Sequence, residues 1–383
     1  MPLLKETMTK EQRLLFTIKF QPTDRVPVIP LMGQWVARYM KLPKGLRFRV
    51  PQEVLQSFKD MYTMLGEYDA QYVAGFSWPR SSARISGSMG EMISAGKKGI
   101  PDNFSVQYAE KENIYFEDYQ KIINLGWNKF CEEYFPKVTG TSLGQLDAAQ
   151  KSELAVYKED TKTWNKMGVP VMTGALVISA EMTLSLGRTL PQFTMDLHRH
   201  PDVVQAALEV MVPDFIHNAI DDVKASGLPW VNISLERGSG AYYNLKTYER
   251  FFFPQLKKMV DAFAREGFIT VMHMDTNWIK NLPYLLELPR QKCICELDGT
   301  TDIFKAKEIL KDHTCLMGDV PAAILSFGHP EEVTAYSEKL IDVIGKNGGF
   351  ILSTGCECPV DAKFENMKAL CDTAKTRSAT YSL

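Results

Sequence analysis

The chain has 383 residues, of which 45% are hydrophobic, and its 44 Lys and Arg residues against 46 Asp and Glu residues leave a formal net charge of -2. A chain of this size can bury a large core, and the absence of a basic run argues against nucleic acid as a partner. No stretch approaches the ~20 apolar residues that span a bilayer, and the N-terminus shows no signal-peptide pattern. We therefore expect a cytoplasmic protein without a membrane partner.

Short β-rich runs recur along the chain, and most of them precede a segment with helical periodicity. This alternation predicts parallel strands joined by crossover helices. The expected strands are 26–32, 70–76, 169–178, 230–236, 268–275, 292–298, 315–320 and 350–356, and the clearest helices are 201–226, 246–266, 302–311, 330–346 and 361–376. Eight such units predict an α/β fold, a (β/α)₈ TIM barrel, with a doubly wound open sheet as the alternative.

The region 77–166 interrupts the alternation and is rich in Tyr, Phe and Trp. We expect a single barrel domain over residues 1–383 in which 77–166 is an inserted, aromatic-rich lid over one end of the barrel. Its aromatic side chains either wall a pocket for an aromatic substrate or pack the lid itself. The candidates are Phe76, directly before this region, and, within it, Trp78, Tyr108, Tyr115, Phe116, Tyr119 and Trp127.

Polar residues collect where the later strands end, and in a barrel these ends build the active-site face. The segments are ISLERGSG, VMHMDT, CICELDG, GDVP and GCECP. They contain Glu236, His273, Asp275, Cys295, Glu296, Asp298, Asp319, Cys356 and Cys358. Side chains two apart on a strand share a face, so His273 and Asp275 can point at one site, as can Cys356 and Cys358.

Two thiols directly after the last strand allow a disulfide, a nucleophile, core packing or metal ligation. The seven cysteines are an odd number, and five lie between residues 293 and 358, which in a reducing compartment argues against disulfides. A nucleophilic Cys/His pair lacks a recognisable signature here. Imidazole, carboxylate and thiolate from neighbouring strands suit zinc, whereas buried cysteines are common in cores. From the residues alone, metal binding and packing stay open.

Five segments in this order carry a resemblance to a known family: PTDRVPVIPLMGQW, LKTYERFFFPQLKKMVDAF, VMHMDT, GDVPAAILSFGHPEEV and GGFILSTGCECPVDAKFENMKAL. The chain resembles the uroporphyrinogen decarboxylase superfamily and, within it, the cobalamin-dependent methyltransferases. The decarboxylases of this family hold a tetrapyrrole with many carboxylates through clustered arginines after the first strand. The corresponding segment here, GQWVARYM, contains only Arg38.

The methyltransferase branch resembles the chain more closely, because its zinc lies on a His-x-Cys pair and on the Cys of a Gly-Cys turn. His273 and Cys356 match two of these positions, whereas the middle one is Asp275. The resemblance therefore implies zinc on His273, Asp275 and Cys356. Glu236, Cys295, Glu296 and Cys358 remain alternatives for the third ligand.

Replacing one thiolate by a carboxylate makes zinc a better Lewis acid toward oxygen. With the resemblance, this implies a zinc-dependent O-demethylase that passes methyl from a methoxylated, aromatic compound to the cobalt(I) of a corrinoid protein. A methylcobalamin:thiol methyltransferase and a decarboxylase-like tetrapyrrole-binding protein are the alternatives. A homodimer stays open. We assign catalysis to Glu236 and Glu296, and substrate binding to Gln34, Trp78, Asp298 and Asp319.

Overall fold

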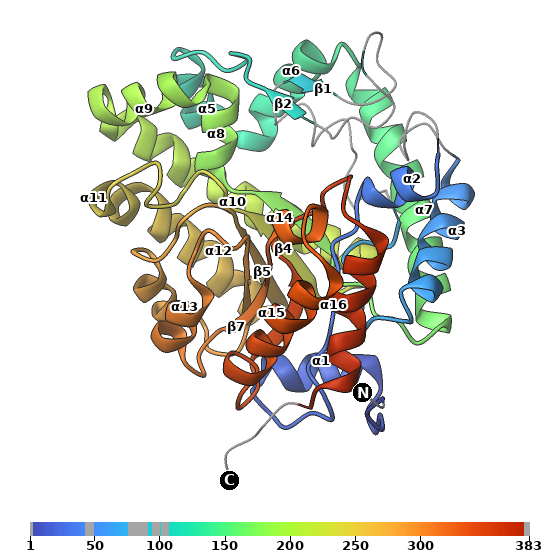
Figure 1. The fold of residues 1–383 in the computed structure, drawn as a ribbon. Helices are drawn as coiled ribbons and strands as arrows, with labels where there is room; N and C mark the ends of the chain where they lie inside the picture. The colour runs from blue at the N-terminus through green and yellow to red at the C-terminus, as the bar shows by residue number, and fades with distance from the viewer. Residues whose placement is uncertain (1–2, 43–49, 76–90, 94–99, 101–106, 379–383) are drawn as a thin grey trace.

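The computed structural model describes residues 3–42, 50–75, 91–93, 100 and 107–378. Its main sheet is parallel, with neighbouring strands in chain order (Figure 1). The strands are β3 (Ala175–Ile178), β4 (Trp230–Ser234), β5 (Ile269–Met274), β6 (Cys293–Leu297), β7 (Cys315–Val320) and β8 (Phe350–Thr354). Each corresponds to one of the last six predicted strands, so the α/β class is confirmed.

The first two predicted strands are reduced to isolated parallel bridges, Val28 with Leu352 of β8 and Gln71 with Val171. Pro27 and Pro30 have no backbone N–H to donate to a neighbouring strand, and this keeps the first segment from forming a regular strand. Backbone hydrogen bonds still join the parts: Ile29 N donates to Leu352 O at 2.9 Å, and Asp69 N donates to Val28 O at 2.9 Å. These contacts connect β8 back toward β3, and the barrel prediction is confirmed.

The predicted strand 169–178 is also interrupted, at Gly174. A Cβ at this position would lie 1.8 Å from the carbonyl oxygen of Leu228. Only glycine, which has no Cβ, therefore allows the backbone to come this close to Leu228. Pairing with β4 begins only at Ala175.

The interior of the barrel is filled by apolar side chains in its lower part and by polar ones near the mouth. Val271 on β5 and Ile294 on β6 belong to the interior cluster. Two positions further along the same faces stand His273 and Glu296, and on β7 the corresponding residue is Asp319. The interior cluster consists of Leu14, Ile18, Ile29, Leu31, Ala70, Met172, Trp230, Val271, Ile294, Cys315, Met317 and Ile351. The interior is therefore a packed core that leaves chemistry to the C-terminal ends.

The helices surround the sheet (Figure 1). They are α1 (Lys10–Ile18), α2 (Trp35–Tyr39), α3 (Pro51–Met64), α8 (Ala180–Arg188), α9 (Leu190–Arg199), α10 (Pro201–Ser226), α11 (Leu245–Thr247), η2 (Tyr248–Phe252), α12 (Phe253–Arg265), η3 (Leu282–Glu287), α13 (Ile303–Leu310), α14 (Ala322–Ser326), α15 (Pro330–Val343) and α16 (Phe364–Thr376). The predicted helix 246–266 contains the π-turn η2, where Phe253 N donates to Tyr248 O just before Pro254, which has no N–H to donate. Among the described residues, none of these helices is both long and apolar enough to cross a membrane.

The described part of the insertion contains β1 (Glu91–Ile93) antiparallel to β2 (Gln107–Ala109), then α5 (Asp118–Leu125), α6 (Trp127–Thr139) and α7 (Leu143–Lys166). Trp127 is buried, and its ring lies 5.6 Å from that of Phe215 on α10. The buried Tyr119 donates to Asp196 at 3.0 Å. These two rings pack the insertion against the barrel helices. Phe76 and Trp78 lie outside the described residues.

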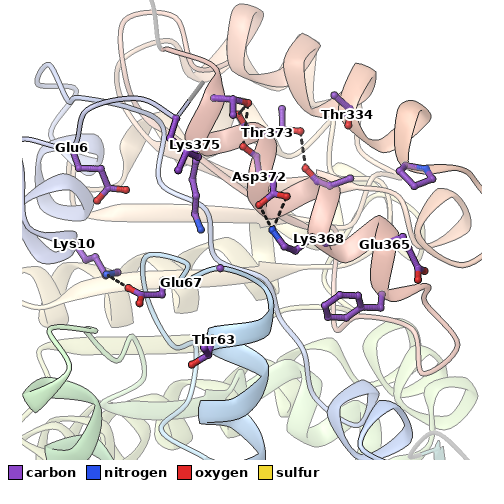
Figure 2. A pocket seen from close by; sticks show the side chains of 16 residues that line it. Glu6, Lys10, Thr63, Glu67, Thr334, Glu365, Lys368, Asp372, Thr373 and Lys375 are labelled. Atoms are coloured by element: carbon purple, nitrogen blue, oxygen red, sulfur yellow. Dashed lines mark hydrogen bonds and ion pairs between the residues drawn. The ribbon is translucent and has the colours of Figure 1, made fainter. Parts of the chain in front are cut away.

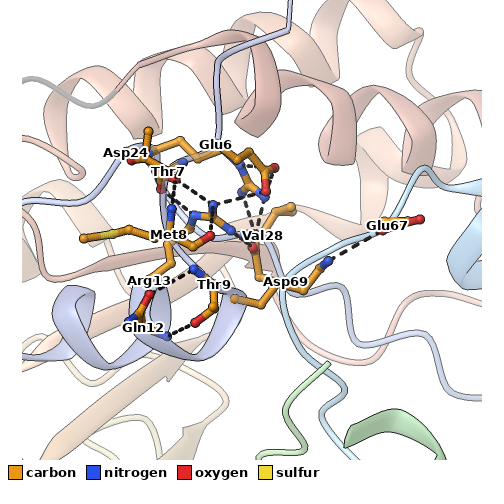
Figure 3. Close-up of polar contacts among 12 residues, drawn as sticks. Glu6, Thr7, Met8, Thr9, Gln12, Arg13, Asp24, Val28, Glu67 and Asp69 are labelled. Atoms are coloured by element: carbon orange, nitrogen blue, oxygen red, sulfur yellow. Dashed lines mark hydrogen bonds and ion pairs between the residues drawn. The ribbon is translucent and has the colours of Figure 1, made fainter. Parts of the chain in front are cut away.

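A buried ion network ties α1 to the first two β segments (Figure 3). Asp69 accepts from Arg13 at 2.7 Å, from Arg25 at 2.6 and 3.0 Å, and from Val28 N at 2.7 Å. Asp24 accepts from Arg13 Nε at 2.6 Å. Burial raises the pKa of Asp24, but the hydrogen bond and charge of Arg13 and the backbone N–H groups of Thr7 and Met8 together outweigh it and lower this pKa to about 2. The network stabilises the closure of the barrel where strand pairing is sparse.

Candidate metal centre

His273 places its two ring nitrogens toward different partners. It lies on the inward face of β5, directly opposite Glu296 of β6, and its Nδ1 is 3.1 Å from Glu296 Oε2. Its Nε2 is 3.3 Å from Asp275 Oδ1 and 3.6 Å from Cys356 Sγ. Three donor types, imidazole nitrogen, carboxylate oxygen and thiol sulfur, therefore meet at the C-terminal ends of β5 and β8.

The turn after β8 aims Cys356 at this point. A Cβ at Gly355 would lie 2.8 Å from the carbonyl oxygen of Asp298, so only glycine fits the close approach between the two loops. Thr354 Oγ1 donates to Cys356 O at 2.7 Å and accepts from Leu31 N at 3.2 Å. The thiol is held by its backbone while remaining partly exposed.

The three donor atoms fit the dimensions of a zinc site. Those of His273, Asp275 and Cys356 all lie within 4.8 Å of one another. Zinc bonds of roughly 2.0–2.3 Å at tetrahedral angles separate ligand atoms by about 3.4–3.6 Å, close to the 3.3 and 3.6 Å measured from Nε2 to Asp275 and Cys356. Among the described residues, buried Asp275 Oδ1 has no partner outside this group, whose His273 imidazole and Cys356 thiol are its only neighbours of that kind. The group can hold a zinc ion and leave a fourth position open.

Three of the four other residues considered as third ligands do not face the donor atoms of this group. Cys358 Sγ is 3.3 Å from Met367 Sδ in the core outside the barrel, and Cys295 is buried on the outward face of β6. Glu296 contacts His273 at Nδ1, on the side of the ring opposite the other donors. The prediction for Cys358 as a spare ligand has no geometric support, because its thiol packs against a helix.

The electrostatics of the site favour positive charge between the donors. Burial would lower the pKa of His273, but the carboxylate of Glu296 and hydrogen bonds with Asp275 and Cys356 outweigh it and raise this pKa well above its ordinary value. Burial raises the pKa of the Cys356 thiol, an effect that His273 opposes. A dication at this position would be stabilised by the same carboxylates that now stabilise a protonated imidazole.

Tyr72 is a site residue that the sequence reasoning missed. Its hydroxyl donates to Glu296 Oε2 at 2.8 Å, so this oxygen accepts from both Tyr72 and His273. The only signal in the sequence was its position in the second predicted strand, two residues after the inward Ala70. Tyr72 and Glu296 together fix the orientation of the imidazole.

Two further carboxyl groups lie near the mouth. Glu236 follows β4, and burial raises its pKa, whereas His273 lowers it. Glu181 on α8, which the sequence analysis did not single out, is buried, and this burial raises its pKa to about 7. Each has one carboxyl oxygen without a hydrogen-bond partner among the described residues. Glu181 is therefore disposed to hold a proton near neutral pH, and Glu236 keeps its proton more readily than an ordinary glutamate does.

The predicted substrate-binding residues are mostly engaged in local structure. Asp298 accepts from Thr276 N at 2.9 Å with one oxygen and from Thr300 N at 2.9 Å with the other, so it organises the loop after β6. Asp319 is buried and accepts from Tyr336 at 2.8 Å, and burial raises its pKa to about 7. Gln34 donates its backbone N–H to Glu357 at 2.8 Å. Trp78 lies outside the described residues.

Comparisons with known proteins agree with this architecture. Residues 158–377 match the family described as Uroporphyrinogen decarboxylase (URO-D). The chain is similar to uroporphyrinogen decarboxylases of Chlorobium phaeovibrioides, 29% identical over 141 residues that cover 35% of this chain and 38% of the relative, and of Chlorobium luteolum, 26% identical over 185 residues that cover 44% and 51%. The chain thus spans about half the length of the curated relatives it matches, or less. A solved structure, a methyltransferase from Methanosarcina mazei, has the same fold, with a TM-score of 0.71 at 15% identity over 96% of this chain and 98% of that one.

Proposed function

The chain belongs to the uroporphyrinogen decarboxylase family, and from this premise we propose that it is a zinc-dependent methyltransferase. In this proposal it demethylates a methoxylated, aromatic compound and passes the methyl group to the cobalt(I) of a corrinoid protein. The observation that carries the proposal is the meeting of His273, Asp275 and Cys356 within 4.8 Å at the mouth of the barrel. An imidazole, a carboxylate and a thiolate with one open position are typical of catalytic zinc.

The mouth of the barrel is poorly suited to a tetrapyrrole substrate, although the curated relatives are uroporphyrinogen decarboxylases. The carboxylates of Asp275 and Glu296 lie at the site, and they would repel a substrate with many carboxylates. Arg38, the only arginine in the segment where that activity needs several, is exposed on α2. Charge therefore favours the methyltransferase over the decarboxylase.

Zinc in this site would supply a Lewis acid for the ether oxygen of the substrate. Glu296 and Tyr72 hold the imidazole so that Nε2 faces Asp275 and Cys356, where the ion would be bound. In the proposed transfer the cobalt(I) of the corrinoid substrate would supply the electron pair of the new bond to the methyl carbon, and the pair of the broken methyl–oxygen bond would stay on oxygen. Glu236 is the proton donor we assign to that oxygen, because burial raises its pKa.

A thiol methyltransferase is the second candidate, because the zinc sites of such enzymes also contain a cysteine ligand, as Cys356 would be here. The discriminating residue is Asp275, whose carboxylate leaves zinc less electron-rich than a second thiolate would. That residue favours an oxygen-bound substrate.

The function is tested with purified zinc-loaded protein and cobalt(I) cobalamin. We expect a panel of methoxyarenes to convert the cobalt(I) spectrum to that of methylcobalamin, whereas methylamines leave it unchanged. A parallel reaction offers methylcobalamin and a thiol. Turnover in that reaction alone would replace the present proposal with the thiol methyltransferase, and no turnover in any arm would reject methyl transfer.

Glu296→Gln is expected to weaken zinc binding about 10- to 100-fold, since carboxylates that orient a metal-binding histidine have effects of this size. The amide keeps the shape of the side chain but removes the charge beside Nδ1 of His273. Competition with a chromogenic chelator measures the affinity. Glu331→Gln, at an exposed position on α15, is the control, and equal affinities in the two variants would contradict the role of Glu296.

A further inference from the structure

A groove with a volume of about 1060 Å³ lies between the N-terminal segment, the end of α3 and α16 (Figure 2). Its wall combines apolar side chains, among them Leu3, Phe364 and Ala369, with charged ones. The size is that of a small-molecule site. The groove does not include any of the residues assigned to the metal centre.

Most charges along this groove have a partner. Lys10 pairs with Glu67 at 3.6 Å, and Lys368 with Asp372 at 2.5 Å. Glu6 is held at 2.8 Å by Arg25, a member of the buried ion network. Among the described residues, these pairs leave Glu365, which is exposed, and Lys375 as the wall charges without an ion-pair partner.

Lys375 differs from these side chains. It is 9% exposed, and its ammonium has no hydrogen-bond or ion-pair partner among the residues that the structure describes. Its Nζ lies 3.1 Å from the point where a Cβ on Gly66 would stand, and the Nζ of Lys368 lies 3.5 Å from the same point. In Figure 2 both side chains reach toward this part of the groove. An ammonium has three N–H donors, so Lys368 keeps at least one for a further acceptor.

Lys375 lines the groove, so an anion that enters the groove can supply the partner that the described residues do not. Burial lowers the pKa of Lys375, and nearby Arg25 lowers it further, whereas Cys371 and Asp372 act in the opposite direction. A bound oxyanion would supply the missing acceptor to two ammonium groups at once.

We propose that this groove binds a small organic anion, with its carboxylate or phosphate group between Lys368 and Lys375 and its apolar part against Phe364 and Ala369. The site is distinct from the metal centre and does not depend on the proposed methyl transfer. Both lysines lie on α16, which begins at Phe364. The ring of Phe364 also stacks on Tyr39 of α2 at 4.9 Å.

Titration calorimetry with phenyl phosphate, benzoate and inorganic phosphate tests the site on the full chain. We expect saturable binding of phenyl phosphate or benzoate, with the stronger of the two identifying the head group, and weaker binding of inorganic phosphate. Lys375→Met should weaken binding at least about tenfold, the effect of losing one charged hydrogen bond. Lys375→Arg keeps the charge and should retain most of the affinity.

A site-specific readout accompanies the calorimetry. Acetylation of Lys375 by acetic anhydride, followed by mass spectrometry, should slow when the bound anion is present, whereas exposed Lys305 on α13 should react at the same rate with or without it. Lys305→Met is the matched control variant, and Lys368→Met replaces Lys375→Met if the latter does not fold. Equal affinity in the wild type and the folded lysine variants, or no saturable binding of any probe, overturns the proposal.

Discussion

Cys356→Ser is expected to lose most of its bound zinc and, with it, nearly all methyl transfer, whereas Cys358→Ser keeps most of both. The sulfur of Cys356 is 3.6 Å from His273 Nε2, and a neutral hydroxyl is a far poorer zinc ligand than a thiolate. Cys358 Sγ instead packs 3.3 Å from Met367 Sδ. Its replacement costs some packing but removes no donor from the site.

Elemental analysis of the two purified variants, with the cobalt(I) assay beside it, measures the difference. The pair is well matched, because the two cysteines are two residues apart in one loop and undergo the same chemical change. One zinc ion per chain in Cys356→Ser would contradict the assignment of Cys356 as a ligand. Equal loss in both variants would mean that the two thiols share the ion.

Asp69→Asn is expected to destabilise the protein by about 3–5 kcal/mol, the usual effect of removing one partner from a buried ionic network. Arg13 and Arg25 are 0% and 1% exposed, and both direct guanidinium donors at the lost carboxylate. The same carboxylate accepts from Val28 N in the segment that closes the barrel. Charge, hydrogen bonding and barrel closure are therefore weakened together.

Urea unfolding followed by circular dichroism measures this change in the free energy of unfolding. Asp312→Asn is the control, since Asp312 pairs with Arg290 at the surface with its side chain 65% exposed, and such pairs contribute about 0–1 kcal/mol. A change below about 1 kcal/mol in Asp69→Asn would show that the network is dispensable for stability.

The sequence by itself determined where the later strands lie and which chemistry gathers at their ends. Strand β7 was predicted at Cys315–Val320 with both ends correct. Turn residues on both sides of a β-rich run define where the strand begins and ends. The two-residue period also placed His273 with Asp275, since alternate side chains share a face whatever the rest of the fold does. These are local properties, and local pattern is sufficient to predict them.

Only the tertiary structure decided how the barrel closes and which donors meet. The first two β segments contribute single bridges and a buried ion network instead of regular strands. Val28 pairs with Leu352 and Gln71 with Val171, which are 324 and 100 residues away in the chain. Cys356 and Cys358 look equivalent in the sequence, yet one faces His273 and the other packs against Met367. Tyr72 reaches Glu296 across 224 residues of sequence. Periodicity gives the face of a strand, whereas the distance between side chains on different strands and the direction of an imidazole ring depend on the stagger and closure of the whole barrel.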